Sequence, residues 1–247
     1  MPPDGHTRGV KGSGNGMATA TVTESNTKTR RGVRSGRPPK ELAGEVDERI
    51  LEAARKVFLE RGFEGASVDE IAETARAGKP TIYARFANKQ ELFKATLMRH
   101  VADKHSRVAS YSPSGSTVEE RLASIGAAVL RETLTSEAIG LVRLGIAEAR
   151  NFPDLGGSVC RTARAQGAET VARLLGEVAD CGTFKASPEF GQNGTIAAQY
   201  FLDLIVLPLF MRALSGESLE TLHAEIGTHV TERVAFFLAA CRQNGSH

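Results

Sequence analysis

A chain of 247 residues is long enough for one large domain or two smaller ones, and its 41% hydrophobic fraction is that of an ordinary folded protein. Its 31 Lys and Arg residues nearly balance 29 Asp and Glu residues, which excludes a uniformly basic or acidic chain, and three cysteines without C-x-x-C spacing argue against a disulfide framework or a zinc site. No apolar run reaches the roughly 18 residues of a membrane span, and the amino terminus has no signal-peptide core, so we expect a cytoplasmic protein without a membrane partner.

Residues 1–44 form the first predicted region, a disordered basic arm. They are rich in Gly, Ser, Thr, Pro and charge, and large apolar residues are almost absent, so they cannot bury enough surface to offset the entropy of ordering. The segment Arg30–Lys40 carries five positive charges and no acid. Its Gly36-Arg37-Pro38 sequence is similar to the AT-hook type of minor-groove arm, which implies DNA contacts by Arg37 and Lys40. A solubilising tail is the alternative.

Residues 45–92 are predicted to form a DNA-binding domain of three helices. The first helix spans Asp47–Arg61 and ends at Gly62. Its apolar residues recur at helical spacing: Ile50, Ala53, Ala54, Val57 and Phe58. The second helix begins at Ser67, whose hydroxyl forms a predicted capping box with Glu70 three residues later. Its apolar face consists of Val68, Ile71, Ala72 and Ala75.

A turn at Arg76–Gly78 leads into a short third helix. Pro80 lies in its first turn, where a missing N–H costs nothing, and Ile82 and Phe86 share the inward face. The outward face then carries Lys79, Thr81, Tyr83 and Arg85. A short basic helix that crosses another helix after a tight turn is typical of a helix-turn-helix.

The motif IAE-x-A-x(3)-K-P-T-I-Y-x-x-F-x-x-K-x-x-L, from Ile71 to Leu92, resembles the DNA-binding signature of the TetR/AcrR family of bacterial repressors. The resemblance implies a homodimer whose recognition helices enter successive major grooves of a palindromic, double-stranded DNA operator. It also implies a larger helical domain that binds a small-molecule inducer, and therefore a repressor that its ligand releases from DNA. A small-molecule-binding helical enzyme and a ligand-independent architectural DNA binder are the alternatives.

The turn departs from the family pattern. Where the family usually has Gly-Val-Ser, this chain has Arg76-Ala77-Gly78, which puts Arg76 where left-handed backbone is favoured. Because positive φ is costly for a residue with a side chain, we expect the turn to be reshaped.

The predicted DNA contacts divide into two kinds. Lys79 and Thr81 are assigned to base edges, whereas Tyr83, Arg85 and Lys89 are assigned to phosphates. Asn88 and Glu91 cap the helix that Lys89 begins, so the partial positive charge of the helix start assists a phosphate there. The complete predicted set is Arg37, Lys40, Ser67, Arg76, Lys79, Pro80, Thr81, Tyr83, Arg85 and Lys89.

Residues 93–247 are predicted to form a second, larger helical domain for ligand binding and dimerisation. The predicted helices are Asn88–Ser110, Thr117–Leu134, Ser136–Asn151, Leu155–Asp180, Thr195–Leu214 and Ser218–Cys241. No convincing strand pattern occurs, so the predicted class is all-α. Pro208 is expected to kink the penultimate helix.

The last two helices have broader apolar stripes than one chain readily covers. In the family, the corresponding helices form a four-helix bundle across the dimer axis, and these stripes are compatible with that arrangement. We therefore expect a homodimer through the last two helices. An intramolecular core is the alternative.

The predicted inducer pocket lies between helices that contain many small residues, which either leave a cavity or let backbones approach closely. The expected walls are Phe93, Leu97, His100, Val101, Phe152 and Phe201, and the expected polar anchors are His100, Arg143 and Gln199. Ordinary core packing is the alternative for each of these residues.

Catalytic chemistry is not indicated by any motif. Ser158 lacks the second glycine and the preceding strand of a nucleophile elbow, and no two histidines have the four-residue spacing of a helical metal site. We therefore expect no enzymatic activity, no metal and no cofactor.

Overall fold

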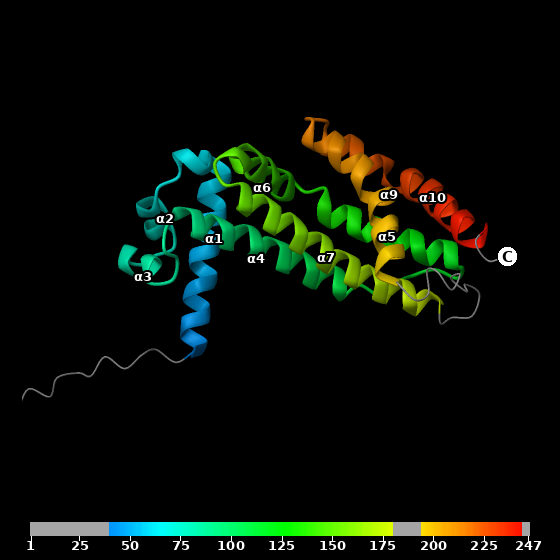
Figure 1. The fold of residues 1–247 in the computed structure, drawn as a ribbon, viewed down its shortest axis with the longest axis horizontal. Helices are drawn as coiled ribbons and strands as arrows, with labels where there is room; N and C mark the ends of the chain where they lie inside the picture. Colours follow the sequence, from blue (N-terminus) through cyan, green and yellow to red (C-terminus); the bar gives the residue numbers. More distant parts are fainter. Residues whose placement is uncertain (1–39, 180–193, 244–247) are drawn as a thin grey trace, which may run out of the picture. The chain divides into compact units, whose positions relative to one another are not determined.

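The computed structural model describes residues 40–179 and 194–243, and every regular element within these ranges is helical (Figure 1). In chain order the elements are α1 (Lys40–Gly65), α2 (Val68–Thr74), α3 (Lys79–Tyr83), α4 (Lys89–Ala109), α5 (Val118–Thr133), α6 (Ser136–Ala147), the 3₁₀ turn η1 (Glu148–Arg150), α7 (Pro153–Ala179), α9 (Gly194–Leu214) and α10 (Leu219–Gln243). This confirms the predicted all-α class, with a helix-turn-helix followed by a helical domain.

Side-chain caps fix where several helices begin. Ser67 Oγ accepts a hydrogen bond from the Glu70 amide at 3.1 Å, and Asn88 Oδ1 accepts one from the Glu91 amide at 2.8 Å, as the sequence predicts. The Glu70 carboxylate pairs with Arg61 at 3.2 Å, so the structure shows only the Ser67 half of the predicted capping box. The starts of α2 and α4 are thus specified locally.

Several helix boundaries differ from the prediction. Helix α1 begins at Lys40, inside the predicted arm of residues 1–44, and not at Asp47, and α6 ends at Ala147, where η1 follows. Helix α1 continues to Gly65, but Gly62 has φ 74° and ψ 175°, so the regular helix is interrupted where the sequence predicts its end. Pro153, predicted to lie in a break, is instead the first residue of α7, a position where proline's fixed φ is favourable.

The core consists of two apolar clusters. The first core joins the helix-turn-helix to later helices and includes Phe58, Ile71, Ile82, Phe93 and Leu97 together with Leu141 and Leu155. The second core lies among the end of α4, α5, α7, α9 and α10, and it includes Val108, Leu130, Phe201, Ile205 and Val230. Helix α4 therefore contributes to both cores. The first core extends past the predicted domain boundary at residues 92 and 93, which stays a prediction.

Helix α9 passes the length and composition test for a membrane span, with a mean hydropathy of 1.6. The sequence did not indicate α9 as a possible membrane span, because Asp203 and Pro208 interrupt its apolar run. One such helix is weak evidence, since the core helix of a soluble protein has the same composition. Phe201, Ile205 and Leu209 of α9 are buried in the second core.

Candidate nucleic-acid interface

The turn between α2 and α3 keeps a left-handed residue at Arg76, where the sequence predicts a reshaped turn. Arg76 has φ 49°, the one positive φ outside glycine among the described residues. The Ala77 amide donates to Ala72 O at 2.9 Å and the Arg76 amide donates to Glu73 O at 3.0 Å, which is the paired closure of a Schellman motif. The expectation of a reshaped turn is therefore wrong, because these two hydrogen bonds hold Arg76 in the conformation usually taken by glycine.

Helix α3 has one buried residue, one half-buried residue and three exposed residues. Ile82 is buried against the first core, and Phe86 beyond the helix is half-buried. Lys79, Pro80 and Tyr83 are exposed, and Thr81 is half-buried. Of the predicted outward face, Lys79 and Tyr83 are exposed and Thr81 and Arg85 are half-buried, and their contacts with DNA stay a prediction.

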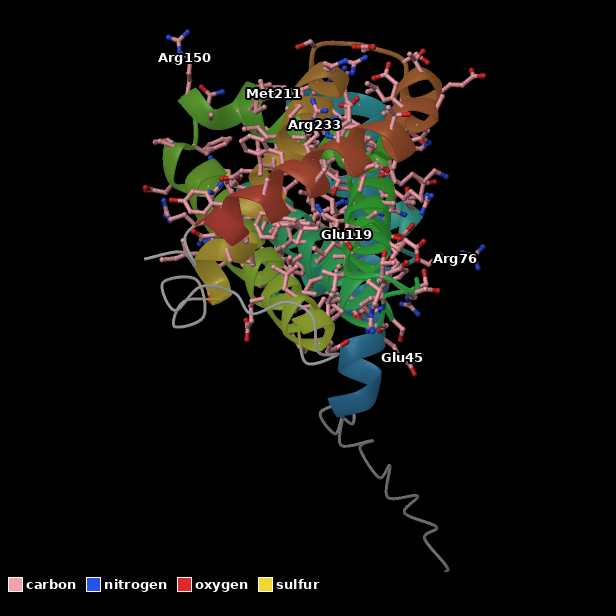
Figure 2. All side chains as sticks on the ribbon, turned by 90° about the vertical axis from the view of Figure 1, so that its right-hand side faces the viewer. Glu45, Arg76, Glu119, Arg150, Met211 and Arg233 are labelled. Atoms are coloured by element: carbon pink, nitrogen blue, oxygen red, sulfur yellow. The ribbon has the colours of Figure 1, made fainter. Side chains whose placement is uncertain are left out.

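Two further predicted DNA contacts lie beside this face. Ser67 at the start of α2 and Arg76 in the turn are both exposed. The Arg76 side chain extends from the surface (Figure 2) and has no ion-pair partner within the part of the chain that the structure describes. These two residues add a hydroxyl and a free cation to the α3 surface.

Lys79 has a partner that DNA could readily replace. Its Nζ atom lies 2.9 Å from Asp69 Oδ2, and the two side chains are 45% and 70% exposed. Exposed ion pairs of this kind contribute little to stability and are screened by salt. Lys79 is therefore available for a base or a phosphate.

Arg85 and Lys89 make internal contacts that the sequence did not indicate. Arg85 pairs with Asp47 of α1 and donates to Thr81 O at 3.2 Å. Lys89 Nζ donates to the carbonyls of Phe63 at 2.8 Å, Ala66 at 3.1 Å and Glu64 at 3.4 Å, and it lies 4.5 Å from the centre of the Phe63 ring. The ammonium group thus caps the end of α1, and a phosphate contact by Lys89 would have to replace one of these three bonds.

The remaining predicted DNA contacts fall at the edge of the structure. Arg37 lies outside the described residues. Lys40 is the first residue of α1, but its side chain is also outside them.

The structure places the predicted ligand residues in separate locations. Phe93 packs edge-on against Phe58 at 4.9 Å, and Phe152 packs against Phe63 at 5.2 Å, so both belong to an aromatic group within or beside the first core. Leu97 is in the same core, whereas Phe201 contacts Phe237 at 5.3 Å in the second core. These four walls do not line one pocket here.

The predicted polar anchors are also dispersed. Arg143 donates to Ala213 O at 2.8 Å and to Leu214 O at 3.2 Å, so its guanidinium caps the carboxyl end of α9. Gln199 is half-buried on α9. His100 Nδ1 lies 2.9 Å from Glu137 Oε1, and Val101 beside it is half-buried on α4. His100 and Val101 lie next to each other on α4, between Leu97 of the first core and Val108 of the second. Among the predicted ligand residues, they form one neighbouring pair that belongs to neither core.

An apolar surface on α9 and α10 forms the second candidate interface. Its exposed large side chains are Ile196, Tyr200, Leu207 and Met211 on α9 and Phe236 on α10. A groove of about 370 Å³ crosses this surface between Tyr200 and Phe236, with Leu204, Phe237 and Cys241 in its lining. The described residues contain no group of three or more His, Cys, Asp or Glu side chains that could hold a metal ion.

Two sequence profiles match the chain. A profile described as bacterial regulatory proteins of the tetR family matches residues 50–96. A second profile, described as the AefR-like transcriptional repressor C-terminal domain, matches residues 120–243, which is half of the chain.

Curated relatives share the amino-terminal region. The chain is 48% identical over 52 residues to the transcriptional activator FasR of Mycolicibacterium smegmatis, a match that covers 21% of this chain and 24% of FasR. It is 38% identical over 82 residues to the transcriptional repressor ComR of Escherichia coli, over 32% of this chain and 38% of ComR. The matches thus span less than half the length of these relatives.

Solved structures share the fold over most of the chain. A TetR-family transcriptional regulator from Mesorhizobium loti superposes with a TM-score of 0.69 at 22% identity, over 80% of this chain and 97% of that one. The flavonoid-responsive regulator FrrA superposes with a TM-score of 0.57 at 25% identity, over 80% and 97% of the two chains.

Proposed function

Because the chain belongs to the TetR family of bacterial regulatory proteins, we propose that it represses transcription by binding a palindromic operator as a homodimer and is released by a small hydrophobic ligand. The family makes it a DNA-binding transcriptional regulator. The operator symmetry, the sign of regulation and the ligand are the parts proposed here.

The exposed face of α3 is the observation that carries this proposal. Lys79 and Thr81 lie on the first turn of α3, and Tyr83 follows with 45% of its side chain exposed. An exposed amino-terminal turn of a recognition helix is the part that reaches base edges in a major groove. We assign Lys79 and Thr81 to base edges, and Tyr83, Arg76 and Ser67 to the flanking phosphates.

The apolar surface of α9 and α10 supports a homodimer. Tyr200 is 57% exposed and Phe236 is 64% exposed, and both line an apolar groove. Pairing this surface with its copy in a second chain would remove these side chains from water, at about 25 cal/mol for each Å² buried. Two copies of α3 would then face two half-sites related by the dimer axis.

Repression is supported by the carboxyl-terminal match to a repressor domain and by the repressor ComR. The transcriptional activator FasR supports activation as the alternative, over its 52 matched residues. The flavonoid-responsive FrrA supports a small, largely apolar ligand.

Selection of binding sites from random duplex DNA, followed by footprinting on the selected site, tests the proposal. We expect two protected half-sites whose centres lie one helical turn apart, about 34 to 36 Å, or a multiple of it. Thr81→Ala should change the selected sequence. Arg131→Ala, which removes an exposed charge from α5, is the matched control and should leave the sequence unchanged.

Transcription from the selected site, with and without the protein, then gives the sign of regulation. Lower transcript levels that recover with an apolar ligand support repression, and higher levels show activation. An enzyme would protect no palindrome at all.

A further inference from the structure

Lys104 occupies a position in α4 where the helical pattern calls for an apolar side chain. The inward stripe of α4 runs through Leu97, Val101, Lys104 and Val108, at intervals of three or four residues. Leu97 belongs to the first core and Val108 to the second, and both are buried. Lys104 therefore lies at the level where one apolar core ends and the other begins.

The Lys104 ammonium has no counter-ion in contact with it. Its Nζ atom makes no hydrogen bond or ion pair within the described parts of the chain. Burial lowers the pKa of Lys104, and the nearby Glu132 only partly offsets this. The Glu132 carboxylate already accepts a hydrogen bond from Arg107 Nε at 2.6 Å. A desolvated cation without a partner is costly unless an anion joins it.

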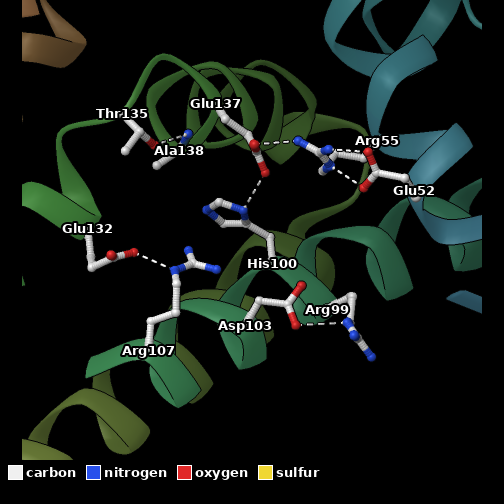
Figure 3. Close-up of polar contacts among 10 residues, drawn as sticks. All are labelled: Glu52, Arg55, Arg99, His100, Asp103, Arg107, Glu132, Thr135, Glu137 and Ala138. Atoms are coloured by element: carbon white, nitrogen blue, oxygen red, sulfur yellow. Dashed lines mark hydrogen bonds and ion pairs between the residues drawn. The ribbon is translucent and has the colours of Figure 1, made fainter. Parts of the chain in front are cut away.

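Two buried polar atoms close to this level of the bundle also have no hydrogen-bond partner: His100 Nε2 on α4 and Gln166 Oε1 on α7. His100 lies one turn before Lys104 on the same side of α4. Its Nδ1 atom is held by Glu137, so the ring is fixed with Nε2 directed away from Glu137, toward the side of the Arg107–Glu132 pair (Figure 3). Buried polar atoms are rarely left unpaired, so both point to a missing partner.

Gln166 belongs to the face of α7 that packs against α4. Thr170, one turn further along α7, lies 2.6 Å from His105 Nε2 of α4. One turn back along both helices, Gln166 therefore comes to the level of Val101 and Lys104. Turning its amide by half a rotation presents the NH₂ group to the same place.

We propose that the carboxylate of an otherwise apolar ligand binds between α4 and α7, with Lys104 as its counter-ion and with His100 Nε2 and the Gln166 amide as its hydrogen-bond partners. This rests on the proposed function and names the chemical class of its ligand. Because the Glu137 carboxylate holds Nδ1–H, His100 Nε2 donates to the ligand only as the imidazolium, whose charge Glu137 balances. Lys104 is then the one cation at the site without a paired carboxylate, which matches a single negative charge better than the nearly double charge of a phosphate monoester. The apolar residues before and after Lys104 on α4 suit the hydrocarbon body of the ligand.

The site is connected to the DNA-binding domain through one carboxylate. Glu137 contacts His100 through one oxygen and Arg55 of α1 through the other (Figure 3). A second contact lies one turn along α6, where a Cβ atom on Gly140 would lie 2.7 Å from Leu59 Cδ2 of α1. A negative charge at His100 Nε2 would favour the imidazolium form and strengthen its bond to Glu137 at the expense of Arg55.

Calorimetric binding of acids and their matched alcohols tests the site. The probes are hexanoate, decanoate and benzoate, each compared with hexanol, decanol and benzyl alcohol. For at least one pair, we expect the wild-type protein to bind the acid about tenfold to a hundredfold more tightly, the effect of one charge-assisted hydrogen bond. Lys104→Met should abolish this preference for the acid and should bind the alcohol with unchanged affinity. Lys94→Met, on the same helix, is the matched control and should behave as wild type.

Lys104→Met replaces a half-buried charge with an uncharged side chain of similar length, so its melting temperature should be equal or higher. His100→Gln is the second variant. It should lower the affinity for the acid and leave the affinity for the alcohol unchanged. The proposal is overturned if wild type shows no preference for any acid, if it binds none of the probes at millimolar concentration, or if Lys104→Met keeps the preference. Operator binding is measured in parallel. A protein that binds its operator and is released only by uncharged compounds would keep the proposed function and lose this ligand class.

Discussion

The left-handed backbone at Arg76 allows the strain in the turn to be separated from the charge of its side chain. With φ at 49°, a residue bearing a Cβ atom costs about 1 to 2 kcal/mol relative to right-handed backbone. Glycine avoids this cost but loses about 0.5 to 1 kcal/mol more conformational entropy on folding than alanine does. Arg76→Gly should therefore be about 0.5 to 1 kcal/mol more stable than Arg76→Ala, although both variants lack the guanidinium.

Urea unfolding of the two variants, at one fixed protein concentration, measures this difference without DNA. Titration of operator binding against salt then measures the charge. If Arg76 meets a phosphate, both variants should flatten the dependence of log affinity on log salt by about 0.9 for each lost contact. The two variants should agree with each other in this slope because they carry the same charge.

The unfolding measurement and the salt titration test separate parts of the prediction, so one can contradict it without the other. Equal unfolding midpoints for Arg76→Gly and Arg76→Ala would mean that the backbone at residue 76 is not left-handed in solution. A salt slope identical to wild type in both variants would remove Arg76 from the DNA interface while leaving the strain argument intact.

Three other predictions rest on contacts and burial in the structure, and a fourth rests on the sequence of the amino-terminal arm. Lys89→Met should lower the free energy of unfolding by about 2 kcal/mol in urea, since it uncaps three carbonyls at the end of α1; lost operator affinity at unchanged stability would instead favour the phosphate role. Phe236→Asp should convert the proposed dimer to monomers in sedimentation equilibrium and leave helical content unchanged, and a persistent dimer would argue against the α9–α10 surface. Burial lowers the pKa of His229, so the unfolded chain takes up a proton first and stability falls as pH drops through the ordinary histidine range, about 6.5; His229→Asn should flatten this loss, and an unchanged pH slope would refute it. Removing residues 1–40 should flatten the salt dependence of operator binding, and an unchanged slope would reduce the arm to a spacer.

The helix-turn-helix could be predicted from the sequence because its signals are local. The caps at Ser67 and Asn88 act over three residues, and the burial of Ile82 follows from helical spacing alone. Even the turn at Arg76 is closed by hydrogen bonds that span no more than five residues. The prediction of a reshaped turn was wrong because it considered the cost of positive φ at Arg76 without the hydrogen bonds that offset it.

The internal partners of the charged residues could not be predicted, because they lie far along the chain. Lys89 caps carbonyls more than 20 residues earlier, and Arg143 caps α9 about 70 residues later. For the same reason, the sequence could nominate Phe93, Phe152 and Phe201 together as walls of one pocket but could not show that Phe201 belongs to a different core from the other two. Lys104 was not singled out by the sequence, because its position gains meaning only once the two cores are located on either side of it.

The contacts between α1 and its neighbours differ in strength, which determines where a ligand could loosen them. Helix α4 holds α1 through Phe93 against Phe58, a buried aromatic contact worth about 0.5 to 1.5 kcal/mol beyond the area that it buries. Helix α6 holds α1 through Glu137 and Arg55, a partly exposed ion pair of a kind worth about 1 kcal/mol or less. The Glu137–Arg55 pair is therefore the weaker of these two contacts of α1, while Leu141 of α6 stays packed in the first core, and Glu137 is the residue at which the weaker contact meets the proposed ligand site.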